Sequence, residues 1–268
     1  MPELTSAYAS LSDWIAREAQ PFSLDSAEAF ATAVDRIIPS LGGSLELLGL
    51  GEALHGGEEL LILRNRLFQR LVEVHGYSAI AVESSYPQAR LVDAYVAGRG
   101  PASYDDVREA GFSHGFGRLE ANRELVEWMR RYNADPTRPV ALRFYGFDSP
   151  TEMTGTASPR QLLNDALDYL AAYDAAAARA HHDAIDPLLG SDAAWENPAA
   201  MMDPSQSIGR SPEANALRVA TEDLIVELGM RRPDLVARSG GERYGEALHD
   251  ATMARQLLAY HAELARAS

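Results

Sequence analysis

The chain has 268 residues, of which 46% are hydrophobic and 24% charged, a composition typical of a folded globular protein rather than a disordered one. Its 39 acidic residues outnumber the 24 basic ones, and the net charge of −15 disfavours a nucleic-acid or membrane-surface partner. The absence of cysteine excludes disulfides, thiolate metal sites and cysteine nucleophiles.

The N-terminal part of the chain predicts two short amphipathic helices. Apolar residues recur at helical spacing over residues 4–19 and 25–38, and Asp25 is the expected N-cap of the second helix. Residues 1–20 contain several charged side chains and no unbroken apolar run, so they resemble neither a signal peptide nor a membrane span. We therefore expect a cytoplasmic protein.

The next stretch predicts a strand–helix–strand–helix unit. The apolar runs Leu45–Leu50 and Ser78–Val82 are typical of buried strands. Each run is followed by a helical pattern, over Glu58–His75 and Pro87–Ala97 respectively. This order with short joints predicts a right-handed crossover and a parallel sheet.

The pattern then changes character. A glycine-rich loop over residues 101–117 precedes a predicted helix over Glu120–Asn133 and a third strand over Val140–Phe147. Ser158 is the expected N-cap of an alanine-rich helix that runs to about Ala184. Beyond it we expect a long irregular loop and two closing helices, over residues 186–212, 213–229 and 242–266.

These elements together predict an α/β fold: a mostly parallel sheet with flanking helices and an α-helical lid or C-terminal layer. We expect residues 1–150 to form the α/β core that carries a site at the strand ends. Residues 151–268 are expected to form a helical region that packs on or over this core.

An acidic residue follows each of the three predicted strands: Glu52, Glu83 and Asp148. Ligands of open parallel sheets bind outside the carboxyl ends of the strands, so these carboxylates are expected to converge on one crevice. Each acid taken alone fits a helix cap or a solvated loop equally well. Their joint occurrence is what predicts a site.

Two further residues point to the same crevice. His55 lies three residues after Glu52, where a carboxylate can orient its ring for general-base work, although a capping or exposed histidine is the alternative. Arg64 falls within the apolar stripe of the predicted helix and requires an anionic partner there. The alternative for Arg64 is a structural ion pair with Glu83 or Glu52, and such a pair is also compatible with a functional role.

The string Gly111-Phe-Ser113-His-Gly115 matches the pattern of a serine nucleophile, and Asp148 and His249 follow it in chain order. Such a serine stands on a sharp turn directly after a strand. The preceding residues 105–109 (DDVRE) are charged and do not alternate, so we do not expect Ser113 to be a nucleophile.

The sequence resembles the erythromycin esterase family. The similarity lies in GEALHGGE (51–58), Arg64 and AIAVE (79–83), followed by ARLVDAYVAG (89–98), WMRRYN (128–133), FYGFD (144–148) and DATMA (250–254). Family members usually continue beyond the length of this chain and supply a second histidine, whose context neither His249 nor His261 matches.

The resemblance implies hydrolysis of a carboxylic ester or lactone, such as a macrolide, by activated water without a cofactor. His55 would be the general base, Glu52 and Glu83 would orient the ring or the water, and Arg64 would hold the acids or stabilise an oxyanion. We expect the small-molecule substrate to contact Asp148, Asn122 and Met253.

Two alternatives remain. The chain could be a degenerate homologue that binds a small molecule without turning it over. It could also be a metal-dependent hydrolase in which Glu52, His55 and Glu83 hold Zn²⁺ or Mn²⁺, because one imidazole and two carboxylates suit either ion.

Overall fold

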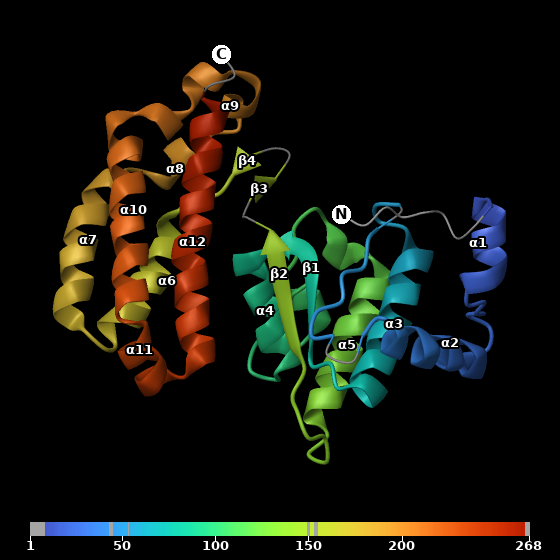
Figure 1. Cartoon of the computed structure of the whole chain (residues 1–268). Helices are drawn as coiled ribbons and strands as arrows, with labels where there is room; N and C mark the ends of the chain where they lie inside the picture. Colours follow the sequence, from blue (N-terminus) through green and yellow to red (C-terminus); the bar gives the residue numbers. More distant parts are fainter. Residues whose placement is uncertain (1–8, 43–44, 53, 149–150, 153–154, 266–268) are drawn as a thin grey trace.

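The computed structural model describes residues 9–42, 45–52, 54–148, 151–152 and 155–265. Figure 1 shows two groups of elements side by side, with the chain up to β2 in one group and helices α6 to α12 in the other. The first group comprises α1 (Leu11–Glu18), α2 (Ala27–Ser40), α3 (Glu58–His75), β1 (Ala79–Ser85), α4 (Tyr86–Val96), α5 (Glu120–Ala134) and β2 (Arg143–Asp148). The second comprises β3 (Thr151–Glu152), β4 (Gly155–Thr156), α6 (Arg160–Ala171), α7 (Ala175–Leu189), α8 (Asp192–Trp195), α9 (Ala199–Met202), α10 (Pro212–Met230), α11 (Arg232–Ser239) and α12 (Gly241–Leu264).

Local signals place the early helices. The N-cap of helix α2 is one residue later than predicted: it is Ser26 rather than Asp25, and its side chain accepts a hydrogen bond from the backbone N–H of Ala29 at 3.1 Å. Helix α3 has the predicted bounds, and it ends where Gly76 adopts a left-handed φ of 78°. The first residues of the predicted 4–19 helix lie outside the described residues.

The parallel sheet is smaller than predicted. Strands β1 and β2 pair in parallel, with Ala79 opposite Arg143, and β1 has no second partner strand among the described residues. The predicted strand Leu45–Leu50 is wrong: the segment has no regular secondary structure and pairs with neither strand of the sheet. An apolar run indicates contact with apolar surface, not which strand it pairs with. The described fold is therefore mostly helical with a small parallel sheet.

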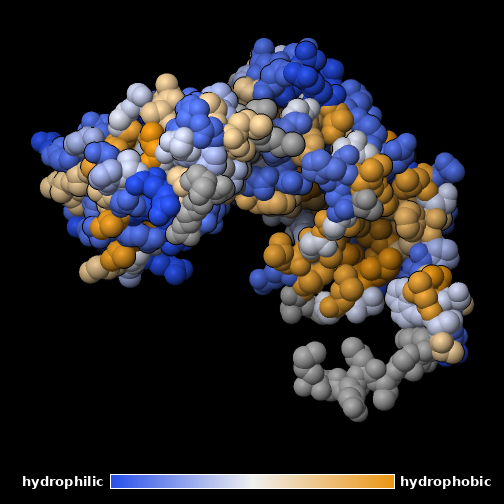
Figure 2. All heavy atoms as spheres, turned by 90° about the horizontal axis from the view of Figure 1, so that it is seen from above, coloured by the Kyte–Doolittle hydropathy of each residue, from blue (hydrophilic) through white to orange (hydrophobic). Residues whose placement is uncertain are grey.

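The segment that fails to pair leaves apolar surface open. Leu47 is 85% exposed and Leu50 is 57% exposed, as is Phe147 on β2. Figure 2, which views the molecule from above, shows apolar residues gathered in an orange patch on the first group of elements. On the second group the orange spheres are scattered. The other side of the sheet is closed, because α4 and α5 bury Val92, Met129 and their neighbours against it.

The helical region differs from the prediction in two places. The predicted helix from Ser158 is interrupted before Ala175, because the side chain of Asp174 accepts hydrogen bonds from the N–H groups of Ala176 and Ala177 and caps α7. Helix α11 occupies a stretch for which the sequence predicts no element. Residues 186–212 are irregular with short helical turns, as expected. No helix in the described part of the chain is both long and apolar enough to span a membrane.

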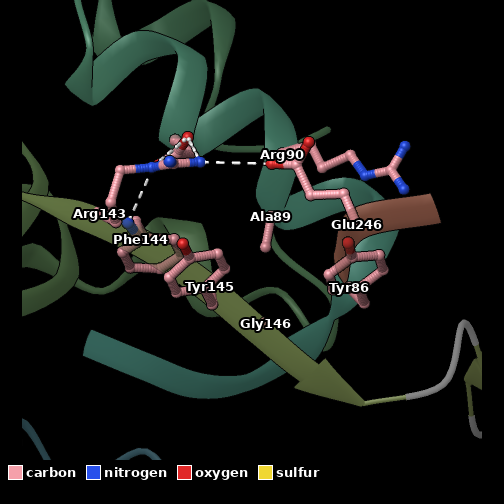
Figure 3. A pocket seen from close by; sticks show the side chains of 9 residues that line it. Tyr86, Ala89, Arg90, Arg143, Phe144, Tyr145, Gly146 and Glu246 are labelled. Atoms are coloured by element: carbon pink, nitrogen blue, oxygen red, sulfur yellow. Dashed lines mark hydrogen bonds and ion pairs between the residues drawn. The ribbon is translucent and has the colours of Figure 1, made fainter. Parts of the chain in front are cut away.

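Ion pairs join the two groups of elements. Arg90 of α4 contacts Asp165 of α6 at 2.7 Å and also pairs with Asp250 of α12. Arg143 of β2 reaches Glu246 of α12 at 3.5 Å (Figure 3). The helical region is therefore docked against the outer side of α4 and β2.

Candidate functional site

Glu52, His55 and Glu83 meet at the carboxyl end of β1. Nδ1 of His55 lies 2.7 Å from Oε2 of Glu52 and 3.8 Å from Oε2 of Glu83. The second oxygen of Glu52 accepts a hydrogen bond from the backbone N–H of Gly56 at 3.1 Å. The turn that carries His55 thus also holds the Glu52 carboxylate. Because Nδ1 of His55 is engaged with Glu52, Nε2 is the ring nitrogen that remains for a substrate or water.

The position of Glu52 has a different origin from the one predicted. It follows a segment without regular secondary structure rather than a strand of the sheet, and a turn closed by the hydrogen bond from the Gly57 N–H to the Leu54 carbonyl at 3.1 Å brings His55 back toward β1. Glu83 stands on β1 itself. The predicted meeting of an imidazole with two carboxylates therefore occurs without the predicted strand pairing.

Arg64 lies on the face of α3 that lines a hollow, which Glu52 and Glu83 also line. Its guanidinium donates hydrogen bonds to the side-chain oxygens of Asn65 at 2.8 Å and Asn122 at 2.7 Å. Burial lowers the pKa of Arg64 to about 10, and the charges of Glu52 and Glu58 oppose that shift. The predicted ion pair is absent: the hydrogen bonds that Arg64 makes among the described residues end on neutral amide oxygens.

The hollow has a volume of about 1060 Å³ and runs along the unpaired edge of β1. Glu52, Arg64 and Glu83 line it together with the apolar segment Leu45–Leu50 and apolar side chains of α3. His55 stands at its rim rather than in its lining. Every described lining residue precedes Asp148, so no described residue of the helical region lines the hollow.

The three predicted substrate-binding residues lie in different surroundings. Asn122 lines the hollow, accepts a hydrogen bond from Arg64 and donates one to the carbonyl of Phe116 at 2.9 Å. Asp148 ends β2, and its pKa is raised by burial and by the charge of Glu83. Met253 is buried in the core of the helical region, away from the hollow.

Sequence reasoning missed two aromatic residues in the loop before α5. The ring centroids of His55 and Phe116 are 5.0 Å apart, and those of His114 and Phe116 are 5.6 Å apart. The only sequence signal was the string around Ser113. That serine is 2% exposed, and its hydroxyl accepts a hydrogen bond from the backbone N–H of Ser85 at 2.9 Å. Ser113 therefore has a structural role and is not placed as an exposed nucleophile.

The same cluster could hold a divalent cation. Ligand atoms of Glu52, His55 and Glu83 all lie within 4.8 Å of one another. Tetrahedral ligands at about 2.1 Å from an ion stand roughly 3.4 Å apart, so the 2.7 Å contact between Glu52 and His55 is a hydrogen-bond separation. A metal ion would have to move the ring and the carboxylate apart.

A model of the erythromycin esterase family matches residues 72–268. The match includes Glu83, Asn122 and Asp148 and begins after His55 and Arg64.

Three solved structures share the fold. A protein from Bacillus cereus aligns with a TM-score of 0.69 and 19% identity over 93% of this chain and 55% of its own. A succinoglycan biosynthesis protein aligns with a TM-score of 0.61 and 18% identity over 93% of this chain and 60% of its own. A mutant of the erythromycin esterase EreC in its open conformation aligns with a TM-score of 0.58 and 20% identity over 88% of this chain and 53% of its own. The chain thus spans little more than half the length of each structure.

Proposed function

The chain belongs to the erythromycin esterase family, and on that premise we propose that it hydrolyses a carboxylic ester or lactone with water activated by His55. Family membership supports a hydrolase of the esterase kind. The single observation that carries the mechanism is the 2.7 Å contact between Nδ1 of His55 and Glu52, beside Glu83.

The contact supports a general-base role for His55. A carboxylate that accepts the Nδ1 proton holds the imidazole in the tautomer whose Nε2 carries a lone pair. Nε2 then removes a proton from water while the oxygen attacks the ester carbonyl. Glu83 orients the ring or the water and stabilises the imidazolium that forms.

The environment of Arg64 supports a role in charge stabilisation. Attack on the carbonyl places negative charge on its oxygen, and a fixed donor in a partly dry site stabilises that charge most strongly. A guanidinium bonded to neutral amide oxygens keeps its positive charge for such an anion. Arg64 lines the hollow in which the ester would lie.

The hollow favours a bulky apolar substrate. Its lining is mainly leucine and aromatic side chains, and Glu52, Arg64 and Glu83 are among its polar residues. The EreC structure carries the name erythromycin esterase, and a macrolide-like lactone is accordingly the substrate that we propose for this chain.

The test compares two histidines with opposite expectations. His55→Ala should lower kcat/KM for an apolar ester or macrolactone by roughly 10²–10⁴-fold, the usual contribution of a general base. His182→Ala, at an exposed histidine of α7 that also neighbours an acid, should leave the rate unchanged. Equal rates for His55→Ala and the unmodified protein would refute the mechanism. Tight binding without turnover of any ester would favour the degenerate homologue instead.

A metal-dependent hydrolase is the second candidate, because the three side chains can converge on one ion. Water activated by metal requires the ion, whereas water activated by His55 does not. Hydrolysis that survives dialysis against a chelator supports the first mechanism. Hydrolysis that is lost and then restored by Zn²⁺ or Mn²⁺ supports the second.

A further inference from the structure

A second histidine–carboxylate pair stands beside the first, and the mechanism above does not use it. Nε2 of His114 lies 3.8 Å from Oδ2 of Asp148, at the end of β2. His55 and His114 both pack against the ring of Phe116, which lines the hollow. The two imidazoles therefore border the same end of the hollow.

The backbone holds His114 in a conformation that few residues adopt. Its φ is 57°, and it is the sole non-glycine residue with a positive φ in the described part of the chain. Such a conformation is strained and persists where the surroundings hold it, commonly at functional sites. The preceding Ser113 is fixed to β1, because its N–H donates to Ser84 Oγ at 3.0 Å and its Oγ accepts from the Ser85 N–H. His114 is thereby tied to the strand that carries Glu83.

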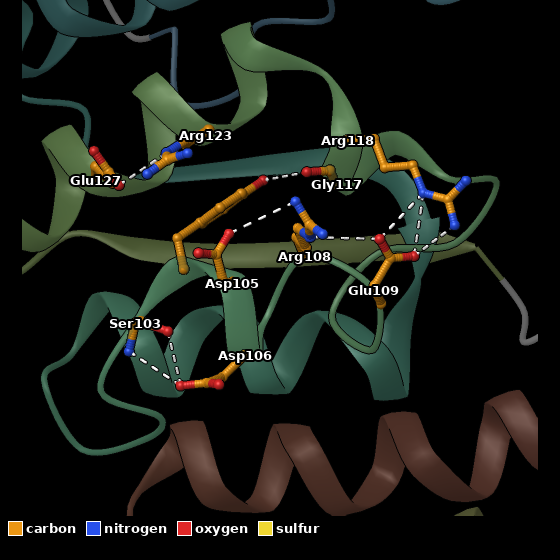
Figure 4. Close-up of polar contacts among 10 residues, drawn as sticks. Ser103, Asp105, Asp106, Arg108, Glu109, Gly117, Arg118, Arg123 and Glu127 are labelled. Atoms are coloured by element: carbon orange, nitrogen blue, oxygen red, sulfur yellow. Dashed lines mark hydrogen bonds and ion pairs between the residues drawn. The ribbon is translucent and has the colours of Figure 1, made fainter.

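The loop that carries His114 is well braced. Tyr104 donates a hydrogen bond to the carbonyl of Gly117 at 2.9 Å, and Arg118 pairs with Glu109 at 2.8 Å (Figure 4). A side chain at Gly117 would collide with the carbonyl of Arg108, so the two arms of the loop touch there. This bracing fixes His114 relative to β1.

One carboxylate, that of Asp148, faces this histidine. Burial and the charge of Glu83 raise the pKa of Asp148, while His114 opposes the shift. The carboxylate of Asp148 thus stands beside the ring, where it can orient the ring and stabilise an imidazolium.

Resting on the proposed function, we propose that His114 is the general acid that protonates the departing alcohol and that Asp148 is its positioning residue. In the collapse of the tetrahedral intermediate, the bond between the carbonyl carbon and the alkoxy oxygen breaks, and its electron pair stays on that oxygen. The proton of the His114 imidazolium passes to the same oxygen. His55 holds the proton taken from water, and exchange with solvent restores both rings.

The test exploits the leaving group. Ethyl hexanoate expels an alkoxide, which requires a proton, whereas p-nitrophenyl hexanoate expels a stable phenolate, which does not. His114→Asn and His114→Gly both tolerate a positive φ, so neither change strains the loop. Each should lower kcat/KM for the ethyl ester by roughly 10²–10⁴-fold and change that for the p-nitrophenyl ester by less than about threefold.

Two further variants complete the design. Asp148→Asn should give the same selectivity for the leaving group with a smaller loss, because the ring remains but its counter-charge is gone. His182→Asn should leave both rates unchanged. Equal losses on the two esters, or no loss on either, in both His114 variants would overturn the inference alone. Unmodified protein that hydrolyses neither ester, or rates unaffected in His55→Ala, would overturn the proposed function and with it this inference.

Discussion

Among single residues, Arg64 shows how the hydrogen-bond acceptors around a guanidinium determine whether its positive charge is neutralised. A guanidinium within an apolar stripe requires hydrogen-bond acceptors, and the sequence predicts a carboxylate as the acceptor for Arg64. The structure supplies Asn65 and Asn122 instead, and Asn65 in turn donates to the carbonyl of Ala121 at 2.6 Å. Neutral acceptors satisfy the N–H groups without cancelling the charge, so Arg64 can still attract an anion.

The matching prediction concerns Arg64→Lys. Lysine keeps the positive charge but has no planar fork with which to contact two amides and an oxyanion together. We expect kcat/KM for both hexanoate esters to fall roughly 10²–10³-fold, as on removal of one oxyanion donor. Arg66→Lys, two residues further along the same helix, is the control and should keep the rate of the unmodified protein. A rate in Arg64→Lys equal to that of the control would remove Arg64 from the mechanism.

Among elements, α2 has two candidate N-cap residues that the sequence alone does not distinguish. Asp25 and Ser26 are both good N-cap types, and their order allows either to begin the helix. In the structure, the Ser26 hydroxyl accepts the N–H of Ala29, and the apolar residues Phe30, Val34 and Ile38 then face α3 and its surroundings. Burial of that stripe sets which residue stands at the helix start.

This arrangement predicts unequal effects of two adjacent substitutions. Ser26→Ala should reduce the free energy of unfolding by about 1 kcal/mol through loss of the cap. Asp25→Ala should leave it unchanged within error, because Asp25 precedes the cap. Urea unfolding followed by circular dichroism measures both values. A larger loss of unfolding free energy in Asp25→Ala than in Ser26→Ala would show that Asp25 is the N-cap of α2.

Considered as a whole, the molecule joins its two groups of elements through α4, β2 and α12. Tyr86 of α4 packs within the helical core and stacks on His249 of α12 with ring centroids 3.9 Å apart. The buried Nδ1 of His249 has no hydrogen-bond partner among the described residues. Burial, assisted by the charge of Arg90, lowers the pKa of His249 below its ordinary 6.5. The junction therefore requires a neutral imidazole.

The sign of the resulting pH dependence follows from linkage. The folded-state pKa of His249 is below the unfolded value, so the unfolded chain binds more protons as the pH falls through 6.5. The contribution of His249 to stability is complete above that pH and is lost toward the folded-state pKa. We expect the melting temperature of the protein to fall with acidification, and to fall less in His249→Gln. The same pH dependence in both proteins would contradict this account.

Much of the chain follows from local signals. The bounds of α3, the start of α5 and the positions of β1 and β2 agree with the predictions to within a few residues, because periodicity, glycine stops and capping act over a single turn. The contact of His55 with Glu52 was also predictable from their spacing of three residues, whereas Glu83 joins them without the strand pairing from which its position was predicted. Met253 lies elsewhere, because short-range similarity does not report burial in a distant core.

By itself, the sequence determined most of the helical and strand segments, the acidic and histidine groups near their ends and the family. Tertiary structure alone decided that Leu45–Leu50 borders a hollow instead of joining the sheet, that Arg64 meets amides, and that His114 stands beside Asp148. The first set depends on residues a few positions apart. The second depends on contacts between residues separated by tens of positions, such as Arg64 with Asn122, and their energies are settled only when the whole chain packs.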